Sequence, residues 1–554
     1  MGFNDILENI GGISRFQVLH TAMLLLPMCF MACHSFLQNF SAAVPAHHCK
    51  VPLMDNGTRD YGHVDFLSFI PVDENQKPKS CLRYREAHFD IWTNNSLTNS
   101  TEPCGDGWVY DKSVFSSTII TEWNLVCRFR KMKQVAQSIY MAGVLIGAVL
   151  LGGLADRFGR KILLMSSYFM MAVFGTCTAF LPSFVCYCVF RYLCGMAFSG
   201  IALNTISLIL EWTPPKGRTV VGTLFAFSFT VGQMQLAGLA YAIRDWRWLQ
   251  FTVSAPYYFF FLYSWFIPES ARWLIMKGRT RQALKDLQRV ARINGKHEEG
   301  DRLSEKVLIS HMQAEMKHIH HSYSPVDLFR TPGMRRVTIS LLLVWFSTSF
   351  VFYGLSMDLQ KFDMSIFLLQ LVFGAIDIPA KVLGAVSMSY LGRRVTQSAA
   401  LMLAGTTMLA NAFVPQGLKT LRIVLAVLGK GLVGGSFNCA YLYSGELFPT
   451  ILRQTGMGVV AMKARVGSMV APLVLMLWEI SPILPSAIYG VAAIISGVAA
   501  LFLCETRNQQ LPDTVEDVEA RFRAKDSCQT DPEEEMALKK CQPQASRGLL
   551  ADTV

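Results

Sequence analysis

The sequence predicts an all-α membrane protein with twelve transmembrane helices, arranged as two six-helix, pseudo-symmetric halves. Three observations predict this fold: an apolar composition, two sets of six long apolar runs, and motifs that recur between the sets. Hydrophobic residues make up 52% of the 554 positions and charged residues only 16%, against about 25% charged in soluble domains. The net charge of +11 is not gathered on a basic soluble domain, which argues against nucleic-acid binding.

The apolar runs have the length that a bilayer requires. A helix needs about 20 mostly apolar residues to cross the hydrocarbon core. Six such runs form an N-terminal half over 16–268, at about 16–44, 135–155, 162–181, 185–210, 219–243 and 248–268. Six more form a C-terminal half over 336–503, at about 336–357, 365–390, 396–414, 420–447, 455–478 and 483–503. The lipid bilayer is therefore the first partner that the sequence predicts.

The segments between the runs predict the orientation. Segment 269–335 is rich in Arg, Lys and His and helical in pattern, and such basic loops collect on the cytoplasmic side. This assignment also places the N-terminal segment 1–15 and the tail 504–554 in the cytoplasm, and segment 45–134 outside. The tail is polar, and we expect it to be disordered.

Segment 45–134 has the features of an extracellular loop. Its cysteines and its N-glycosylation triplets are Cys49, Cys81, Cys104 and Cys127, and Asn56, Asn94 and Asn99. Disulfides and N-glycans both belong to the extracellular side of a membrane. Four cysteines allow three pairings, and the sequence leaves all three open.

An internal repeat predicts the architecture. Loop motifs after the second, fourth and sixth runs recur after the eighth, tenth and twelfth. The matched positions are Gly159 with Gly392, Glu211 and Arg218 with Glu446 and Arg453, and Glu269 with Glu505. Their offsets are 233, 235 and 236 residues, and unrelated segments would not keep so constant a spacing. Two such halves around a midplane site are the arrangement of major facilitator transporters.

The first loop motif, "GGLADRFGRK", is similar to the loop signature of that superfamily. We expect Asp156 to form ion pairs between helices with basic residues such as Arg157 and Arg160. Such pairs, together with the repeated Glu and Arg positions, would latch the cytoplasmic side as the halves rock. Simple anchoring of positive charge on the cytoplasmic face would explain Arg157, Arg160 and Lys161, but not Asp156 or the glycines.

Charged residues inside the C-terminal runs are the main functional candidates. Lys381, Lys430, Lys463 and Arg465 lie there, with Asp377 as the clear acid deep in that half. Asp377 and Lys381 are four residues apart, so we expect them to pair on one helix face. One acid cannot neutralise the other cations, and an unpaired buried charge is costly. The runs therefore predict a cavity that stays positive until an anion enters. Arg465 suits carboxylate or sulfate, because a guanidinium can hold two oxygens at once.

Aromatic residues on three runs are candidates for the walls of this cavity. They are Phe227, Phe229, Trp345, Phe352, Tyr353, Phe437 and Tyr441. Lys430, Gly434, Phe437 and Tyr441 recur at helical spacing, so one helix face carries charge, space and rings. Packing alone would explain any one of these rings. No catalytic triad, zinc-ligand spacing or phosphate loop is found, so we expect no enzyme activity, no metal and no cofactor.

Longer segments carry a family resemblance. "LQNFSAAVPAHHC", "TEPCGDGWVYD", "PESARWL", "LAVLGKG" and "LFPTILRQTGMG" closely resemble the organic anion transporters, a branch of the amphiphilic solute carriers within the major facilitator superfamily. The resemblance implies plasma-membrane transport of small amphipathic organic anions by alternating access, often in exchange for an intracellular dicarboxylate. It implies substrate contacts at Lys430 in "GKG", Lys381 in "PAK", Arg465 in "ARVGS", Trp345, Phe352, Tyr353, Phe437, His34 and Asn39.

The sequence also departs from the family pattern. Tyrosine is common in the family where this chain has Phe352, Phe227 and Phe229. A pocket without these hydroxyls should favour prostaglandins, steroid sulfates or medium-chain carboxylates over short dicarboxylates. Two alternatives stay open: a carrier of organic cations or zwitterions, whose relatives have an acid at the position of Arg465, and a receptor that does not transport. The C-terminal "ADTV" is a weak match for a PDZ-type scaffold.

Overall fold

The computed structural model describes residues 3–50, 70–72, 78–85, 100–310, 325–357, 359–362, 364–415, 417–509 and 511–530. The three N-glycosylation positions, Asn56, Asn94 and Asn99, lie outside the described residues, as does the C-terminal segment 551–554. N-glycosylation and scaffold binding therefore stay predictions.

The N-terminal half contains the first set of predicted helices. They are α2 (Arg15–Phe36), α5 (Met132–Phe158), α6 (Arg160–Thr178), α7 (Phe184–Trp212), α8 (Pro215–Ala242), and α9 (Trp246–Ser254) followed by α10 (Pro256–Tyr263). The last predicted span is built from two short helices because Pro256 lacks the amide hydrogen that a continuous helix needs.

The C-terminal half contains the second set. Its helices are α15 (Pro332–Ser356), α16 (Ile366–Ala375) followed by α17 (Asp377–Tyr390), α18 (Arg393–Phe413), α19 (Lys419–Leu447), α20 (Arg453–Val474) and α21 (Leu484–Leu501). The eighth predicted span is interrupted at Ile376, so Asp377 is the first residue of a new helix.

Ten helical segments of the described chain are long and apolar enough to cross a membrane. The sixth and ninth predicted spans are not among them; both carry polar residues, such as Arg247 and Gln250 in α9 and Gln397 and Asn411 in α18. Both nevertheless lie within their own half: α9 and α10 contact α6, while α18 contacts α19 and α21. The two sets of six predicted from the sequence are thus present in the fold.

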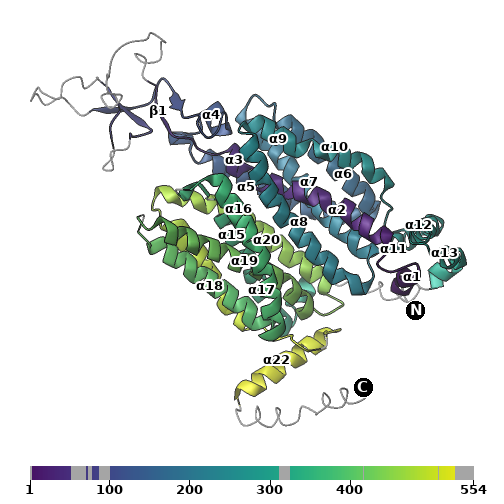
Figure 1. Ribbon diagram of the computed structural model, residues 1–554. Coiled ribbons are helices and arrows are strands. Elements are labelled where there is room, and N and C mark those ends of the chain that lie inside the picture. Colours follow the sequence, from purple (N-terminus) through teal and green to yellow (C-terminus); the bar gives the residue numbers. More distant parts are fainter. Residues whose placement is uncertain are drawn as a thin grey trace, which may run out of the picture.

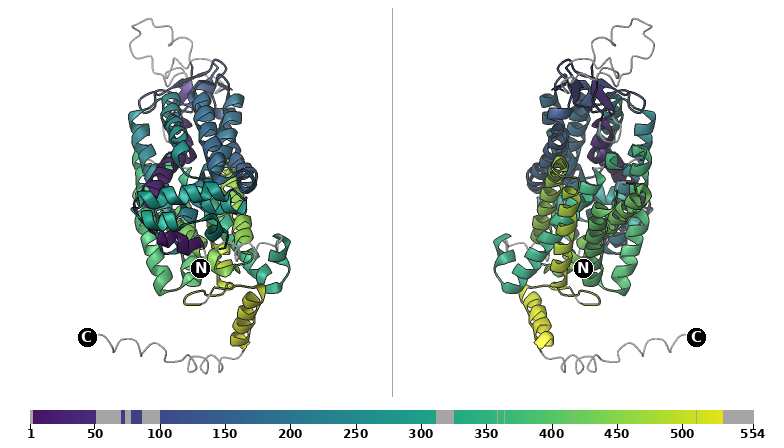
Figure 2. Two further views of the ribbon diagram at one scale, coloured as in Figure 1. Left: turned by 90° about the vertical axis from the view of Figure 1, so that its right-hand side faces the viewer. Right: turned by 90° about the vertical axis from the view of Figure 1, so that its left-hand side faces the viewer.

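The two halves lie side by side as separate bundles, coloured purple to teal and green to yellow in Figure 1. Helix α5 of the first packs against α20 of the second, and α8 packs against α16. Strands β1 to β4 lie at one end of the molecule, which we call the disulfide end, and α22 lies at the other (Figure 2). The bundles meet near the disulfide end and are farther apart at the opposite end, called here the loop-helix end (Figure 1).

The loop-helix end is formed by short helices, as the pattern of segment 269–335 predicts. They are α1 (Phe3–Asn9), α11 (Ala271–Met276), α12 (Thr280–Ile293) and α13 (His297–Arg302). Phe3 and Leu7 of α1 are buried in one apolar cluster with Leu274, Leu287 and Trp212. The N-terminal segment is therefore part of this end of the fold.

The tail corrects a prediction. The sequence predicts disorder from residue 504 onward, but residues 515–530 form helix α22 (Val515–Thr530). Val518 and Phe522 lie four residues apart and are buried against the C-terminal half. Glu519 accepts hydrogen bonds from the backbone N–H groups of Gly333 and Met334, at 2.7 and 3.3 Å, and so caps the start of α15. Two apolar residues and one cap are enough to order this part of a polar tail.

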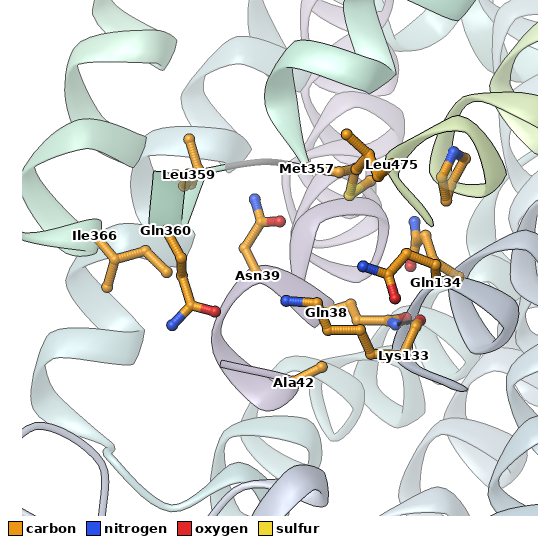
Figure 3. Close-up of a pocket in the computed structure, with 12 residues that line it drawn as sticks. Gln38, Asn39, Ala42, Lys133, Gln134, Met357, Leu359, Gln360, Ile366 and Leu475 are labelled. Carbon is orange, nitrogen blue, oxygen red and sulfur yellow. Dashed lines mark hydrogen bonds between the residues drawn. The ribbon is translucent and has the colours of Figure 1, made fainter. Parts of the chain in front are cut away.

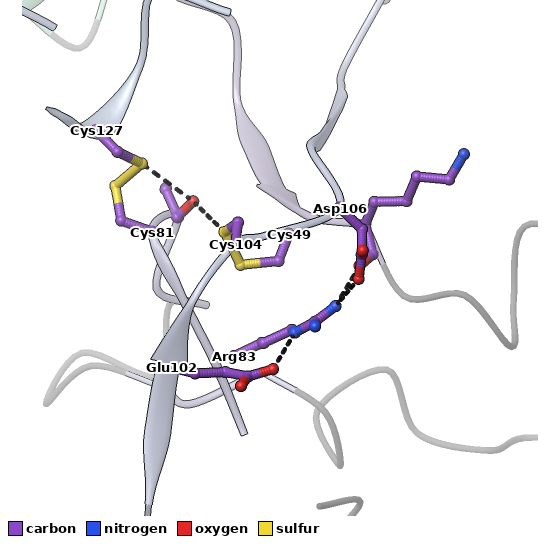
Figure 4. Close-up of a disulfide and its surroundings, with 9 residues drawn as sticks. Cys49, Cys81, Arg83, Glu102, Cys104, Asp106 and Cys127 are labelled. Carbon is purple, nitrogen blue, oxygen red and sulfur yellow. Dashed lines mark hydrogen bonds and ion pairs between the residues drawn. A yellow bond between two sulfur atoms is a disulfide. The ribbon is translucent and has the colours of Figure 1, made fainter. Parts of the chain in front are cut away.

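The disulfide end holds the small amount of sheet in the described chain. Strand β1 (His47–Cys49) pairs antiparallel with β4 (Trp108–Tyr110), and β2 (Leu82–Tyr84) pairs antiparallel with β3 (Thr101–Pro103). The disulfides join Cys49 to Cys104 and Cys81 to Cys127, which selects one of the three pairings left open by the sequence (Figure 4). His47 lies near the second disulfide, whose bonded sulfur atoms are not free to bind a metal.

Candidate functional site

The buried acid of the C-terminal half pairs differently from the prediction. Asp377 and Lys381 do not form an ion pair; the Asp377 carboxylate lies 3.3 Å from Lys430 Nζ on α19. The side chain of Lys430 is 0% exposed and that of Asp377 is 3% exposed. Asp377 is the first residue of α17, and its carboxylate points toward α19 rather than along its own helix. A side chain at Gly434 would collide with this carboxylate, so the glycine permits the approach.

The Lys430 ammonium also lies over an aromatic ring. Its Nζ atom is 3.3 Å from the centroid of the Phe352 ring on α15, a cation–π contact that is strengthened by burial. Lys430 is therefore held by one carboxylate and one ring face, and its charge is neutralised within the protein.

Lys381 reaches into the other half of the molecule. Its Nζ atom donates hydrogen bonds to the Ala226 carbonyl at 2.9 Å and to the Thr230 hydroxyl at 2.7 Å, both on α8. The Phe227 ring centroid lies 5.7 Å away. These partners are uncharged, so the Lys381 ammonium bridges the two halves without being neutralised.

Arg465 is the least satisfied cation of the group. It is half-buried on α20, and within the described residues its guanidinium makes no hydrogen bond and no ion pair. The side chain that interacts with it electrostatically is Tyr353. The nearby Lys463 is exposed and has its Nζ atom 5.4 Å from the Phe346 ring centroid, so it does not join Lys381 and Lys430.

Five of the seven predicted aromatic residues form one connected group. Ring centroids lie 5.7 Å apart for Trp345 and Phe437, 6.3 Å for Trp345 and Tyr441, 5.6 Å for Phe352 and Phe437, and 5.5 Å for Phe352 and Tyr353. Tyr441, at one end of this chain of rings, is 57% exposed. The rings thus continue from the buried Lys430 to an accessible surface.

One ring of this group is missing from the sequence prediction. Phe36 on α2 stacks on Tyr353 at 6.2 Å and lies 5.8 Å from Phe229. It joins the aromatic groups of the two halves, because Phe229 belongs to α8 and Tyr353 to α15. Phe36 has no charged residue at helical spacing on α2, so the pattern that singles out α19 does not extend to it.

Of the two first-span candidates, His34 lies away from this group. It is buried within the N-terminal half, with its ring 3.5 Å from the Ser254 hydroxyl and 5.9 Å from the Tyr257 ring centroid. Asn39 instead joins the halves at the disulfide end: its amide donates to the Ser356 carbonyl at 2.8 Å and to Gln370 at 3.2 Å.

Further contacts close the disulfide end. Gln360 exchanges two hydrogen bonds with the backbone of Val44, at 3.0 and 3.2 Å, and Lys131 pairs with Glu479 at 2.9 Å. A cavity at this end is lined by Gln38, Asn39, Lys133, Gln134 and Gln360, among others (Figure 3). Since its lining includes none of Lys381, Lys430 and Arg465, it is separate from the cationic group.

The repeated charges of the loop-helix end stay within their own halves. Arg160 pairs with Asp156 at 3.2 Å and with Glu211 at 3.4 Å, and Glu269 accepts the backbone N–H groups of Arg160 and Lys161, both at 3.1 Å. Burial raises the pKa of Glu269, and these N–H groups oppose that rise. The predicted inter-helix pairs are therefore present, but those of Arg160 do not latch one half to the other.

The second half repeats the arrangement. Arg393 pairs with Glu446 at 3.1 Å, and Glu505 accepts the backbone N–H groups of Arg393 and Arg394 at 2.8 and 3.0 Å. Gly159 and Gly392 have φ of 103° and 93°, and a side chain at either would collide with Glu269 or Glu505. This explains why both glycines appear in the repeat.

The remaining predicted gating residues have other contacts. Arg218 donates to the Thr213 carbonyl at 3.2 Å and to Asn4 at 3.1 Å, while Arg453 donates to the Phe448 carbonyl at 3.4 Å. The Arg157 guanidinium lies 5.4 Å from the ring of its neighbour Phe158.

Comparison with known proteins decides the family. Residues 90–517 match the family described as "Sugar (and other) transporter". The chain is 51% identical to solute carrier family 22 member 6-A of Xenopus laevis, over 95% of both chains, and 52% identical to member 20 of Mus musculus, over 94% of this chain and 95% of that one. The chain belongs to solute carrier family 22. A further relative, organic anion transporter 3 of Oryctolagus cuniculus, is 48% identical over 99% of both chains.

Solved structures confirm the predicted fold class. The inward-open xylose transporter XylE from E. coli is similar with a TM-score of 0.58 at 18% identity, over 70% of this chain and 89% of that one. A D-xylose–proton symporter has the same TM-score at 14% identity, over 90% of this chain and 99% of that one. This family 22 chain therefore has the major facilitator fold, and its family consists of membrane transporters rather than enzymes.

Proposed function

We propose that this family 22 member carries amphipathic organic anions across the plasma membrane by alternating access. The observation that carries the proposal is the Arg465 guanidinium, half-buried and without an acid partner among the described residues. Lys381 also lacks a carboxylate within ion-pair distance, whereas Lys430 is neutralised by Asp377. Because an ionisable side chain within a membrane span is costly unless it is paired or faces a water-filled cavity, two cations without an ion-pair partner favour an anionic substrate.

The rings support an amphipathic substrate rather than a small hydrophilic one. Phe36, Tyr353, Phe352 and Phe437 offer a continuous apolar wall beside the cations. The phenyl rings at Phe352, Phe227 and Phe229 offer no hydroxyl to a second carboxylate. Prostaglandins, steroid sulfates and medium-chain carboxylates fit this combination best. Rabbit organic anion transporter 3, by its name a carrier of organic anions, supports the substrate class.

The contacts between the halves support a conformation that is open to the cytoplasm. Asn39, Gln360 and Lys131 close the disulfide end, while the pairs of Arg160 and Arg393 leave the halves separate at the other end. We assign the disulfide end to the extracellular side, and α1 and α22, with both termini, to the cytoplasm. An intracellular dicarboxylate would then enter from the cytoplasm as the counter-substrate.

Uptake of labelled prostaglandin E2, estrone sulfate and glutarate tests the proposal, in cells that express the wild type, Arg465→Ala or Arg465→Lys. We expect the first two anions to be taken up faster than glutarate. Loss of a charge-assisted contact should lower uptake by about tenfold or more in Arg465→Ala, with partial recovery in Arg465→Lys. Surface biotinylation controls for the amount of protein at the plasma membrane. Equal uptake by wild type and Arg465→Ala would contradict the proposal.

The counter-substrate is tested separately. Cells preloaded with glutarate should take up estrone sulfate several-fold faster than unloaded cells. An unchanged rate would remove the exchange step and leave the substrate class untouched.

A further inference from the structure

A second buried cation, Arg191 on α7, lies in the other half of the molecule. Its side chain is fully buried. One N–H of the guanidinium donates to the His34 carbonyl at 3.4 Å, and the guanidinium carbon lies 4.3 Å from the centroid of the Tyr140 ring. Arg191 makes no ion pair within the described residues. Among the described residues, two acids are buried. Asp377 is paired with Lys430, and Glu269 lies at the loop-helix end.

Hydrogen-bond donors around Arg191 are also left over. Two guanidinium nitrogens, Nε and Nη1, have no acceptor. The hydroxyls of Tyr140 and Tyr187, whose side chains interact electrostatically with Arg191, lie beside those of Ser35 and Ser41, respectively. A pair of hydroxyls has two hydrogens and uses one of them between its oxygens, so each of these pairs keeps one donor for a further acceptor. All four hydroxyl-bearing residues are at most 1% exposed.

Arg191 and the donors around it require a negative charge and hydrogen-bond acceptors. The contact with the Tyr140 ring offsets only part of the cost of burying an unpaired guanidinium. A water molecule would satisfy donors but not the charge. An organic anion is too large, because α5 and α7 touch at Gly143 and Gly195, where any side chain would meet the facing backbone. A small inorganic anion meets both requirements at once.

We propose that the α2–α5–α7 junction binds one small inorganic monoanion, with chloride as the natural probe. Arg191 supplies the charge through Nε and Nη1, and the hydroxyls of Tyr140 and Tyr187 complete the set of donors. The site is distinct from the Arg465 group, since it is fully buried and belongs to the N-terminal half. The bound ion stabilises that half and is not a transported substrate.

Thermal unfolding of the purified full chain tests the site, in sodium chloride against sodium gluconate at equal ionic strength. Chloride should raise the melting temperature of the wild type in a saturable way. The double variant Tyr140→Phe/Tyr187→Phe keeps the rings and removes two donors, so its half-saturating chloride concentration should rise at least tenfold. Arg191→Met should lose the response altogether; the phenylalanine variant decides the case if Arg191→Met does not fold.

Arg465→Ala is the matched control, and it should keep the full chloride response. The proposal is overturned if the wild type melts at the same temperature in both salts, or if the double variant responds like the wild type. Loss of the chloride response in Arg465→Ala would place the ion in the cationic group and would equally overturn the proposal. Because the readout is stability, these results do not depend on whether organic anions are transported.

Discussion

Two regions of the C-terminal half hold buried cations in opposite electrostatic states. Between α17 and α19, Lys430 is fully buried, paired with Asp377 and covered by the Phe352 ring. On α20, Arg465 is half-buried and interacts electrostatically with the uncharged Tyr353. The difference teaches that a basic residue in a membrane span is available to a substrate only if no neighbouring helix supplies an acid. The charge of Lys430 is thus compensated by Asp377, whereas Arg465 has no carboxylate partner among the described residues.

Breaking the buried pair should give the largest effect. Lys430→Met leaves the Asp377 carboxylate buried and unpaired, which should lower the free energy of unfolding by about 3–5 kcal/mol. The double variant Lys430→Met/Asp377→Asn removes both charges and should recover most of the loss. Thermal unfolding of the purified proteins measures both. If the double variant is no more stable than Lys430→Met, Asp377 and Lys430 do not form the pair described here.

Removing the Lys381 ammonium should have an intermediate effect. Its partners, the Ala226 carbonyl and the Thr230 hydroxyl, are neutral, so Lys381→Met leaves no uncompensated charge behind. We expect little loss of stability and about tenfold slower anion uptake, the value of one charge-assisted hydrogen bond. Thr230→Val keeps the charge and removes one acceptor, and it should slow uptake much less. An equal loss of uptake in Lys381→Met and Thr230→Val would show that uptake depends on the contact between α17 and α8 and not on the charge of Lys381.

The exposed pair between the halves should give the smallest effect. The side chains of Lys131 and Glu479 are 52% and 37% exposed, and pairs in water contribute about 1 kcal/mol or less. Lys131→Ala should raise the fraction of molecules open at the disulfide end by up to about fivefold. Labelling of a cysteine introduced at Gln134, in the cavity of Figure 3, reports that opening. The reversed pair Lys131→Glu/Glu479→Lys should restore slow labelling. Labelling of Lys131→Ala as slow as that of the wild type would show that other contacts hold the end closed, and fast labelling of the reversed pair would show that attraction between the two charges does not hold it.

The sequence predicts the architecture well because membrane spans and repeats are properties of many residues at once. The apolar runs predict the helices, and the similar offsets of three pairs of motifs, one of them marked by Gly159 and Gly392, predict the duplication. The structure shows that these glycines make room for Glu269 and Glu505. The partner of one charged side chain is harder to predict from the sequence, because it depends on how neighbouring helices are placed.

The Asp377 prediction illustrates this limit. Spacing alone favours a pair with Lys381, but the carboxylate lies against Lys430 of α19. Gly374 and Pro379 mark the break between α16 and α17 in the sequence, because Pro379 has no amide hydrogen for the Ala375 carbonyl four residues earlier. They do not show which neighbouring helix supplies the partner of Asp377. The choice between three disulfide pairings and the contacts of Phe36 likewise require the spatial arrangement of the helices.

The central claim is that the charge at Arg465 selects anions, and reversing that charge tests it most directly. Uptake of labelled estrone sulfate and of labelled tetraethylammonium is measured in cells that express the wild type, Arg465→Lys and Arg465→Asp at matched surface levels. The account predicts that the wild type carries the sulfate and not the ammonium, that Arg465→Lys keeps this order, and that Arg465→Asp loses sulfate uptake. Sulfate uptake by Arg465→Asp at the wild-type rate, or tetraethylammonium uptake by the wild type, would contradict it.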